Sequence, residues 1–439
     1  MADISDVIAE GKTKAILPME PGIVRIRSKK DITAGDGAKH DMFDKKDEYA
    51  TTTTCAVFEL LNACYIPTAY CKQIGPTEFE AIHCSMLPYE VVVRRIALGS
   101  YLKRNPRVMR EKRFETLVVE FYLKTSEKQF GSTKLVKDDP LIKGYGPNGV
   151  SVVRPDMPLG EGNDPINIPA VDVYGKDADV GHPFGEMEKL ARQVFLIIEK
   201  AWALQECELC DIKIEFGFAP KGGLVVADVV DNDSWRLFDE NGEHLDKQRY
   251  RDGDTLDVIA ALYQDVAKRV GRFKELHAMP EILIWRASEK DNIDAFFDAV
   301  ENMGLSPELL EELTGSVHKA PEKCLVALRQ HLKEEAYRDK VIIAYVGRSN
   351  GAGPVIQGDT HYPVIAVPAS GKEFPDDVWS SLRMPSDLPM LTCLDPANAI
   401  QAALGILSAR SPLAYMARRY RLEEFKLDWE NSPSFGKWS

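Results

Sequence analysis

The chain has 439 residues, of which 44% are hydrophobic and 28% charged; this composition is typical of a globular protein with two or three domains and excludes a single small module, a disordered chain and a collagen-like one. Asp and Glu number 68 against 55 Lys and Arg, which gives a formal net charge of −13. The phosphates of a nucleic acid would be repelled by such a molecule as a whole. We therefore expect no nucleic-acid partner, and small anions remain possible ligands of local basic pockets.

Signals for a membrane or for secretion are not found in the sequence. The apolar runs, such as residues 341–346 and 364–368, are far shorter than the roughly 20 residues that span a bilayer. The first residues lack a basic stretch followed by an apolar one. Eight cysteines are scattered along the chain, which is typical of a reducing compartment. The sequence predicts a cytoplasmic protein without a membrane partner.

The first half of the chain alternates β-branched segments with polar connections, which predicts a mostly antiparallel sheet. Apolar residues at helical spacing predict helices over residues 52–63 and 186–204 that cover one face of this sheet. Residues 140–185 are dense in Gly, Pro, Asn and Asp, so we expect long ordered loops there. The predicted strands are residues 14–17, 23–27, 90–96, 116–123, 210–218 and 223–230.

The second half follows a different pattern, which begins after a predicted helix over residues 255–277. Short apolar strands alternate with amphipathic helices, and this predicts a parallel sheet with helices on both faces. The strands are expected at residues 281–285, 309–313, 341–346 and 364–368, and the main helices near 293–303 and 322–335. The predicted organisation is a domain of residues 1–265, a linker of 266–279, a domain of 280–427 and a poorly structured tail of 428–439.

A short motif near the start of the chain, EGKTK at residues 10–14, has the composition of a loop that folds over a nucleotide. Its glycine would allow close approach, and Lys12 and Lys14 would meet phosphate oxygens. The spacing of a Walker loop is absent. A solvated turn at the edge of a sheet is the alternative interpretation.

A predicted strand that ends in two arginines, Arg94 and Arg95, is followed by Gly99 and Ser100. One arginine would point to each face of the sheet. A guanidinium and a hydroxyl at this place suit a carboxylate or phosphate. The alternative is a pair of solvated arginines.

The strongest local pattern is formed by two neighbouring segments, DIKIEFG at residues 211–217 and ADVVDNDSWR at residues 227–236. Asp211, Lys213 and Glu215 alternate with apolar residues and therefore share one face of a strand. If Asp228 lies opposite, Glu215 and Asp228 form an oxygen pair suited to Mg²⁺ bound to nucleotide phosphates, and Lys213 would neutralise phosphoryl oxygens during transfer. A solvated face with cross-strand ion pairs is the alternative.

Several separated motifs, EGKTK, DITAGDGAKHD, EVVVRRIALGS, DIKIEFG, ADVVDNDSWR and DKQRYRD, occur in order over roughly residues 1–260. Together they resemble the SAICAR synthetase family, ATP-dependent ligases of purine synthesis. The resemblance implies an α+β, ATP-grasping fold with the nucleotide between two sheets. It places Lys12, Lys14, Glu215 and Asp228 at ATP, Glu215 and Asp228 also at Mg²⁺, Lys213 as the catalytic cation, and Arg94, Ser100 and Arg236 at the ribonucleotide substrate.

Two loops in the second half follow predicted strands: residues 316–319 (SVHK) and residues 347–354 (GRSNGAGP). Loops at the carboxyl ends of parallel strands bind ligands in open α/β sheets, so we expect the two to converge. The glycine-rich loop would offer backbone N–H groups to an anion, and His318 would exchange a proton near neutral pH. A structural histidine is the alternative interpretation.

The motifs SVHK, VGRSNGAGP, HYPVIAVP and DVWSSLRMP occur in order within residues 280–425 and resemble class II AIR carboxylases, which implies an α/β three-layer, flavodoxin-like domain. The resemblance makes His318 catalytic and assigns to aminoimidazole ribonucleotide (AIR) and CO2 the residues Ser288, Ser316, Lys319, Gly347, Arg348, Ser349, Asn350 and Gly351. One departure is plain. That family has a Gly-Ser-x-Ser-Asp loop after the first strand, whereas this chain reads Trp285-Arg286-Ala287-Ser288-Glu289, so Arg286 is the candidate for the substrate phosphate.

The whole chain therefore resembles the bifunctional animal enzymes that join AIR carboxylase to SAICAR synthetase. The resemblance implies carboxylation of AIR by CO2 to its 4-carboxylate (CAIR) without biotin, followed by MgATP-dependent ligation of CAIR to L-aspartate, which yields SAICAR, ADP and phosphate. It also implies a homo-octamer built through the carboxylase domains. The alternatives are a SAICAR synthetase whose second domain is only an oligomerisation scaffold, and a nucleotide-binding regulatory protein without turnover.

Overall fold

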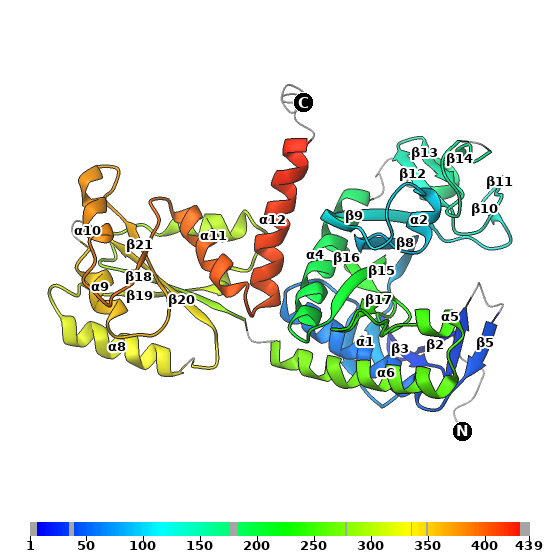
Figure 1. Ribbon diagram of the computed structural model, residues 1–439, viewed down its shortest axis with the longest axis horizontal. Helices are drawn as coiled ribbons and strands as arrows, with labels where there is room; N and C mark the ends of the chain where they lie inside the picture. Colours follow the sequence, from blue (N-terminus) through cyan, green and yellow to red (C-terminus); the bar gives the residue numbers. More distant parts are fainter. Residues whose placement is uncertain are drawn as a thin grey trace. The chain divides into compact units, whose positions relative to one another are not determined.

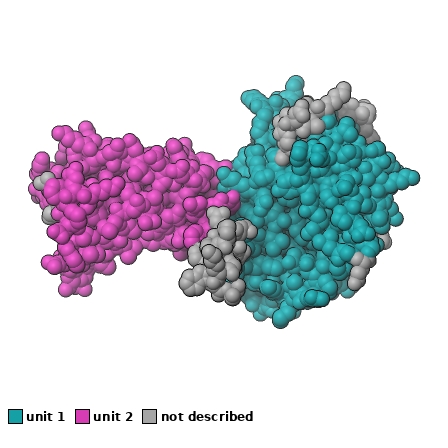
Figure 2. Space-filling model, turned by 90° about the horizontal axis from the view of Figure 1, so that it is seen from above, with its two compact units in different colours: residues 1–62, 66–274, 426–439 teal, residues 63–65, 275–425 magenta. Residues whose placement is uncertain are grey.

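The protein is described by a computed structural model, which covers residues 7–34, 39–160, 162–175, 183–276, 279–334, 336–347 and 350–430. The chain divides into two compact units. The first contains residues 1–62, 66–274 and 426–439, and the second contains residues 63–65 and 275–425 (Figure 2). No helix within the described ranges has the length and the apolar character needed to cross a membrane.

The first unit contains two antiparallel sheets (Figure 1). The smaller has the order β1 (Ala9–Glu10), β2 (Lys14–Pro18), β3 (Ile23–Ser28), β7 (Glu78–Ile82) and β6 (Tyr70–Gln73). The larger has the order β14 (Ile166–Pro169), β13 (Gly149–Val153), β12 (Leu141–Gly146), β9 (Arg113–Leu123), β8 (Ser85–Ile96), β15 (Glu208–Phe218) and β16 (Leu224–Ala227), with β17 (Trp235–Phe238) also paired to β15. Two short hairpins are β4 (Asp31–Ala34) with β5 (Lys39–Met42), and β10 (Gln129–Phe130) with β11 (Thr133–Lys134).

The larger sheet has one apolar face and one charged face because β8 and β15 both alternate. Helix α4 (Phe184–Ala203) packs on β15 and β8 (Figure 1), where it meets buried residues such as Ile212 and Ile214. The register pairs Asp211 with Arg94 and Glu215 with Glu90, so the charged side chains share the opposite face. The other helices of this unit are α1 (Lys46–Ala63), α2 (Ser100–Arg104), α3 (Ala170–Tyr174), α5 (Gln248–Asp252), α6 (Leu256–Val270) and the 3-10 helix η4 (Gly271–Leu276).

Residues 140–185 differ from the prediction of long loops, because their described part contains β12, β13, β14 and α3. One of the glycines that suggested loops, Gly149, permits tight strand pairing instead. Gly149 has a φ of 117°, and a Cβ built there would lie 2.0 Å from the carbonyl oxygen of Ile168 on the neighbouring strand. At Gly149 the glycine therefore allows close backbone approach within paired strands.

The second unit is built on a sheet in which every neighbouring pair of strands is parallel, as predicted. Its order is β19 (Leu310–Thr314), β18 (Glu281–Arg286), β20 (Lys340–Val346), β21 (Val364–Pro368) and β22 (Leu391–Thr392). The helices are α7 (Asp294–Glu301), η5 (Pro307–Leu309), α8 (Pro321–Glu334), α9 (Ala352–Gln357), η6 (Pro375–Asp377), α10 (Val378–Leu382), α11 (Pro396–Leu407) and α12 (Pro412–Glu430).

Helices cover both faces of this sheet (Figure 1). Helices α8 and α9 join the core that contains Leu283, Ile342 and Ala344, while Phe296 of α7 packs its ring on Tyr345, whose side chain points to the other face. The central strands are buried on both faces, which explains their continuous apolar sequences. The end of the chain differs from the prediction: residues 428–430 belong to helix α12 rather than to an unstructured tail, and the rest of that tail lies outside the described residues.

Candidate active sites

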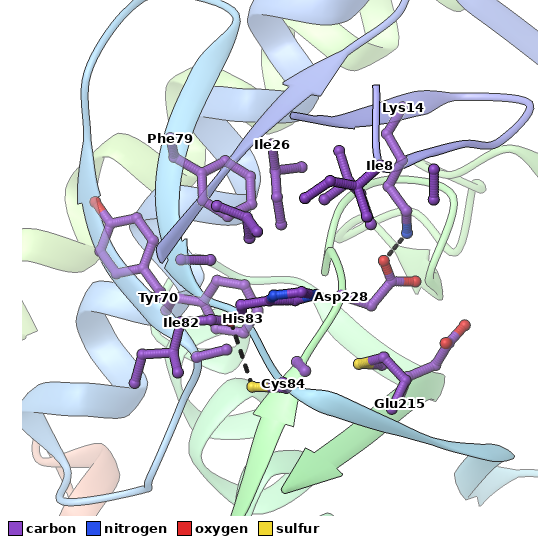
Figure 3. Close-up of a pocket in the computed structure, with 18 of the residues that line it drawn as sticks. Ile8, Lys14, Ile26, Tyr70, Phe79, Ile82, His83, Cys84, Glu215 and Asp228 are labelled. Atoms are coloured by element: carbon purple, nitrogen blue, oxygen red, sulfur yellow. Dashed lines mark hydrogen bonds and ion pairs between the residues drawn. The ribbon is translucent and has the colours of Figure 1, made fainter. Parts of the chain in front are cut away.

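A cavity of about 290 Å³ lies between the two sheets of the first unit. Ile26, Tyr70 and Phe79 form part of its apolar wall, and the carboxylates of Glu215 and Asp228 lie at its other end (Figure 3). The cavity therefore suits a molecule with a flat apolar part and a charged part.

The charged end of this cavity contains two ion pairs. The ammonium of Lys14 contacts the carboxylate of Asp228, and Nζ of Lys124 lies 2.6 Å from Oε2 of Glu215. The predicted pair of carboxylates comes together because β15 and β16 align Glu215 with Ala227. Asp228 follows directly after β16, with a φ of 66°. Lys12 lies in the turn between β1 and β2, and the side chains that line the cavity include Lys14 and not Lys12.

Burial and neighbouring charges set the protonation of these groups. Burial lowers the pKa of Lys14 to about 8, against the opposing effect of Glu215. Burial alone would raise the pKa of Glu215, but Lys213 and Lys124 hold it below its ordinary value. The carboxylate is thus ionised at neutral pH and able to accept a cation.

Lys213 lies between two carboxylates on the charged face of β15. Its Nζ is 2.6 Å from Oε1 of Glu90 and 3.8 Å from Oε1 of Glu215. Burial acts to lower the pKa of Lys213, but the neighbouring carboxylates of Glu90 and Glu215 raise the pKa by more, so the net shift is upward. Lys213 is therefore a fixed positive charge, as electrostatic stabilisation of a phosphoryl group requires.

The charged end of the cavity fits Mg²⁺ that is already bound to a nucleotide. Among the described residues, no group of three or more His, Cys, Asp or Glu side chains could hold a metal ion. Magnesium in nucleotide sites is commonly held by one or two carboxylates together with phosphate oxygens and water. Glu215 and Asp228 supply such a pair of carboxylates, and each is ion-paired with a lysine, Lys124 and Lys14 respectively.

Of the three residues predicted to bind the ribonucleotide, Arg94 and Arg236 converge on Asp211, and Ser100 contacts Arg94. Nη1 of Arg94 and Nη1 of Arg236 donate to Oδ2 of Asp211 at 2.8 and 2.6 Å, and Nη2 of Arg94 donates to Oγ of Ser100 at 3.2 Å. Gly99 has a φ of 58°, and a Cβ there would lie 2.5 Å from Nη2 of Arg236. Only glycine therefore allows this close approach.

The two neighbouring arginines point to opposite faces, as predicted. Nε of Arg95 donates to Oε1 of Glu199 on α4 at 2.8 Å, within the core. Arg94 lies on the charged face and is 3% exposed.

Several charged residues of these sites were missed by the sequence reasoning: Glu90, Arg104, Glu120 and Lys124. Glu120 lies in a predicted strand with apolar neighbours, and Lys124 follows its end, so polar residues in or beside an apolar strand were the available signal. Their partners on other strands depend on a register that a sequence does not show. Cys207 and Cys210 are both free and buried.

In the second unit, the two predicted loops converge at the carboxyl ends of β19 and β20. A Cβ built on Gly351 would lie 2.1 Å from Nε2 of His318, so the imidazole packs directly on the backbone of the glycine-rich loop. His318 and Lys319 are exposed. The backbone N–H of Lys319 donates to the carbonyl oxygen of Ser316 at 3.0 Å. Arg348 and Ser349 lie outside the described residues.

The remaining predicted residues of this site make local contacts. Asn350 is 4% exposed; its Oδ1 accepts the N–H of Gly353 at 2.8 Å and its Nδ2 donates to Oγ of Ser381 at 3.1 Å, so its side chain fixes the loop. A Cβ on Gly347 would lie 3.3 Å from Oγ of Ser370. Oγ of Ser288 accepts the N–H of Lys290 at 3.2 Å.

The altered segment begins with the last two residues of β18, Trp285 and Arg286, whose large side chains point apart. Trp285 is 1% exposed, and its Nε1 donates to the carbonyl oxygen of Gly315 at 3.0 Å. Arg286 donates to Glu312 at 3.0 Å and to Thr314 at 2.9 Å. A phosphate at Arg286 would therefore compete with the carboxylate of Glu312.

Comparisons with known proteins match one enzyme family in each of two regions of the chain. Residues 7–139 and 171–270 match the SAICAR synthetase family, and residues 282–428 match the AIR carboxylase family. A crystal structure of phosphoribosylaminoimidazole-succinocarboxamide synthase from Ehrlichia chaffeensis covers 61% of this chain and 98% of its own, with a TM-score of 0.48 and 23% identity. These family matches define an enzyme of purine biosynthesis with two catalytic domains.

Two curated relatives extend over nearly the whole chain. The bifunctional phosphoribosylaminoimidazole carboxylase/phosphoribosylaminoimidazole succinocarboxamide synthetase of Drosophila melanogaster is 36% identical over 92% of this chain and 89% of its own length. The human protein of the same name is 33% identical over 95% of this chain and 93% of its own length. The chain belongs to this family of bifunctional enzymes, which confirms the prediction of two activities in one protein.

Proposed function

We propose that the first unit binds MgATP in the cavity between its sheets and joins CAIR to L-aspartate, with SAICAR, ADP and phosphate as products. The observation that carries this assignment is the row Asp211, Lys213 and Glu215 on one face of β15. Asp211 holds the arginines of the ribonucleotide site, and Glu215 lines the cavity. Residues two apart on a strand are about 7 Å apart, so Lys213 lies between the two substrates.

The chemistry follows from this arrangement. A carboxylate oxygen of CAIR attacks the γ-phosphorus of ATP and ADP leaves, which converts a poor leaving oxide into phosphate. The amine of L-aspartate then attacks the acyl carbon, and phosphate departs. Lys213, Lys14 and Lys124 balance negative charge on the phosphoryl oxygens, and Mg²⁺ held by Glu215 and Asp228 would add charge neutralisation there. The cavity between two antiparallel sheets supports an ATP-grasping fold.

The second unit, we infer, carboxylates AIR with CO2 at a ring carbon, without biotin or ATP. Its strand order, with the second strand of the chain at the edge next to the first, is that of flavodoxin-like sheets, whose ligands bind at the carboxyl ends of the central strands. His318 lies there, against Gly351. An electron-rich ring needs only a base for the proton that it loses and a site that holds neutral CO2 close.

The state of the protein in the cell is a further part of the proposal. We place the enzyme in the cytoplasm because all eight cysteines are free, in keeping with a reducing compartment. A homo-octamer through the carboxylase units is supported by apolar side chains exposed on one stretch of the second unit: Trp379, Leu382, Leu391 and Leu394. Burial between subunits would remove this apolar surface from water.

One assay tests both activities. The purified chain receives AIR, bicarbonate, L-aspartate and MgATP, and CAIR and SAICAR are followed separately; a second reaction omits ATP and aspartate. We expect SAICAR in the first and CAIR in the second, and His318→Ala should abolish CAIR formation while SAICAR still forms from added CAIR. A wild-type chain that makes SAICAR from CAIR but never carboxylates AIR would leave the second unit as a scaffold, and absence of both products would overturn the assignment.

A further inference from the structure

Glu120 of β9 lies beside the ribonucleotide site and accepts hydrogen bonds from three groups. Nε of Arg94 donates to its Oε2 at 2.8 Å, and the hydroxyl of Tyr122 donates to the same oxygen at 3.0 Å. Nη2 of Arg104 contacts its other oxygen. The side chain of Glu120 is 10% exposed, and those of Arg94 and Arg104 are 3% and 6% exposed, so these charges are held away from water.

This carboxylate joins two elements that carry predicted substrate ligands. Arg94 lies on β8 and Arg104 is the last residue of α2, the short helix that begins at Ser100. Nη1 of Arg104 also donates to the carbonyl oxygen of Pro155 at 2.9 Å. The guanidinium of Arg94 also donates to Ser100, the first residue of α2. Glu120 therefore links the last residue of α2, Arg104, to the arginine that contacts its first residue.

The charges form an alternating chain: Arg104, Glu120, Arg94, Asp211 and Arg236. Burial alone would raise the pKa of Glu120, but Arg94 and Arg104 hold it below its ordinary value, so the carboxylate is ionised. The chain has an excess of one positive charge. Removal of Glu120 would leave two buried guanidinium groups that repel each other, and Arg94 would lose one of the two carboxylates that fix its plane.

We propose that Glu120 is a positioning residue of the ligase, which acts through Arg94 and helix α2 to orient the donors that bind the ribonucleotide carboxylate substrate. The proposal rests on the proposed function of the first unit. Glu120 itself makes its three contacts to protein groups. Its effect therefore falls on the binding of CAIR rather than on nucleotide binding or on the second unit.

The test measures the Michaelis constants of Glu120→Gln and Glu120→Asp for CAIR and for ATP in the full chain. Glu120→Gln keeps the size and removes the charge, and we expect a rise of at least tenfold in KM for CAIR, with kcat and KM for ATP changed less than threefold. Glu120→Asp keeps the charge and should restore KM for CAIR to within about threefold of wild type. Tyr122→Phe removes one donor to Glu120 at 3.0 Å, together with longer contacts of that hydroxyl to Arg94 and Ser100 at 3.5 Å. It does not change the charge and should raise the same constant about threefold, which keeps the test open if Glu120→Gln fails to fold.

A matched control is Glu199 of helix α4, which accepts two hydrogen bonds in the core from Arg95, on the opposite face of β8 from Arg94. Glu199→Gln removes an equally buried acidic partner of an arginine, and we expect it to lower stability without a selective rise in KM for CAIR. An equal rise in the constants for CAIR and ATP in Glu120→Gln, or an unchanged KM for CAIR, would overturn the proposal. A wild-type chain that forms no SAICAR would instead overturn the proposed function.

Discussion

The ammonium of Lys14 contacts the carboxylate of Asp228 at the charged end of the cavity, and burial lowers the pKa of this lysine to about 8. At pH 8 about half of the molecules without nucleotide therefore carry a neutral Lys14. Phosphate groups would favour the charged form, so nucleotide binding should take up close to half a proton at pH 8 and almost none at pH 6.5. Calorimetry of ADP binding in buffers of different ionisation enthalpy measures this uptake.

The control for this prediction is Lys14→Gln, in which the uptake at pH 8 should disappear. The same shift affects stability: the pKa of Lys14 in the folded chain lies below the ordinary value of 10.5, so the unfolded chain binds more protons between these pH values. The contribution of this group to the free energy of unfolding therefore rises as the pH increases from about 8 to 10.5. Binding enthalpies independent of the buffer at pH 8 would contradict the assignment.

Lys213→Ala and Asp228→Asn should each abolish SAICAR formation while carboxylation of AIR continues. Lys213→Ala removes a cation that balances the phosphoryl charge, and Asp228→Asn removes a carboxylate that would hold Mg²⁺, so the rate should fall on the order of a thousandfold in each. Both reactions are measured in one preparation, so the carboxylase rate reports intact protein. Lys72→Ala is the matched control, because Lys72 is an exposed lysine of β6 that pairs with Glu80, and it should retain full ligase activity. Wild-type ligase kinetics in either test variant would remove Lys213 or Asp228 from the mechanism.

Cys84 lines the cavity (Figure 3), whereas Cys71 is exposed on β6. Saturating ADP should slow alkylation of Cys84 by a maleimide at least fivefold and leave the rate at Cys71 unchanged. Burial raises the pKa of both thiols, so labelling is best followed near pH 8.5, with mass spectrometry of the peptides. Equal protection of both cysteines, or of neither, would place the nucleotide elsewhere.

Arg286 is predicted to bind the phosphate of AIR, yet its guanidinium is paired with Glu312. Arg286→Ala should raise KM for AIR at least tenfold and weaken its dependence on salt, because a charge-assisted contact is lost. Glu312→Gln should have the opposite effect and lower KM about threefold, since it frees the guanidinium. SAICAR synthesis from added CAIR should be unchanged in both. If neither variant alters KM for AIR, the phosphate is bound by other residues.

Glu281 at the start of β18 is fully buried and contacts Lys340, His331 and Arg338. Glu281→Gln should destabilise the second unit by about 3–5 kcal/mol, because the buried ammonium of Lys340 loses its partner. The control is Asp359→Asn, which breaks a pair with the exposed Arg329 and should cost about 0–1 kcal/mol. Because the chain contains two compact units, a single unfolding transition does not define the stability of one of them, and hydrogen exchange of the β18 and β20 peptides is the suitable measurement. Unchanged exchange in Glu281→Gln would show that the cluster is not needed for stability.

The sequence allowed a good part of the second unit to be predicted, because fully apolar strands separated by amphipathic helices are buried on both faces of a parallel sheet. The meeting of His318 with Gly351 followed from the rule that ligand loops gather at the carboxyl ends of such strands. Helices α11 and α12 were not predicted, and the glycines between β12 and β13 suggested loops where a hairpin forms. The function of the motifs was inferred from their resemblance to known families, because hydrophobic periodicity indicates only secondary structure.

The ion pairs of the first unit were less accessible to sequence reasoning. Arg94 and Asp211 are 117 positions apart, and their contact depends on the register of β8 and β15. A shift of one residue would turn every charged side chain to the other face. Glu120 and Lys124 have no local pattern that separates them from solvated charges on a strand. Only the paired strands show that their partners are Arg94 and Glu215.

The strands of the two units are separated along the chain: β1 to β17 end at Phe238, and β18 begins at Glu281. Synthesis proceeds from the first residue at about 5–20 residues per second, and domains generally fold as units in that order. The sheets that enclose the cavity are therefore complete while the second unit is still being translated, for a period of roughly 10–30 s. A ribosome halted after the first unit has emerged should already carry a nascent chain that binds ADP.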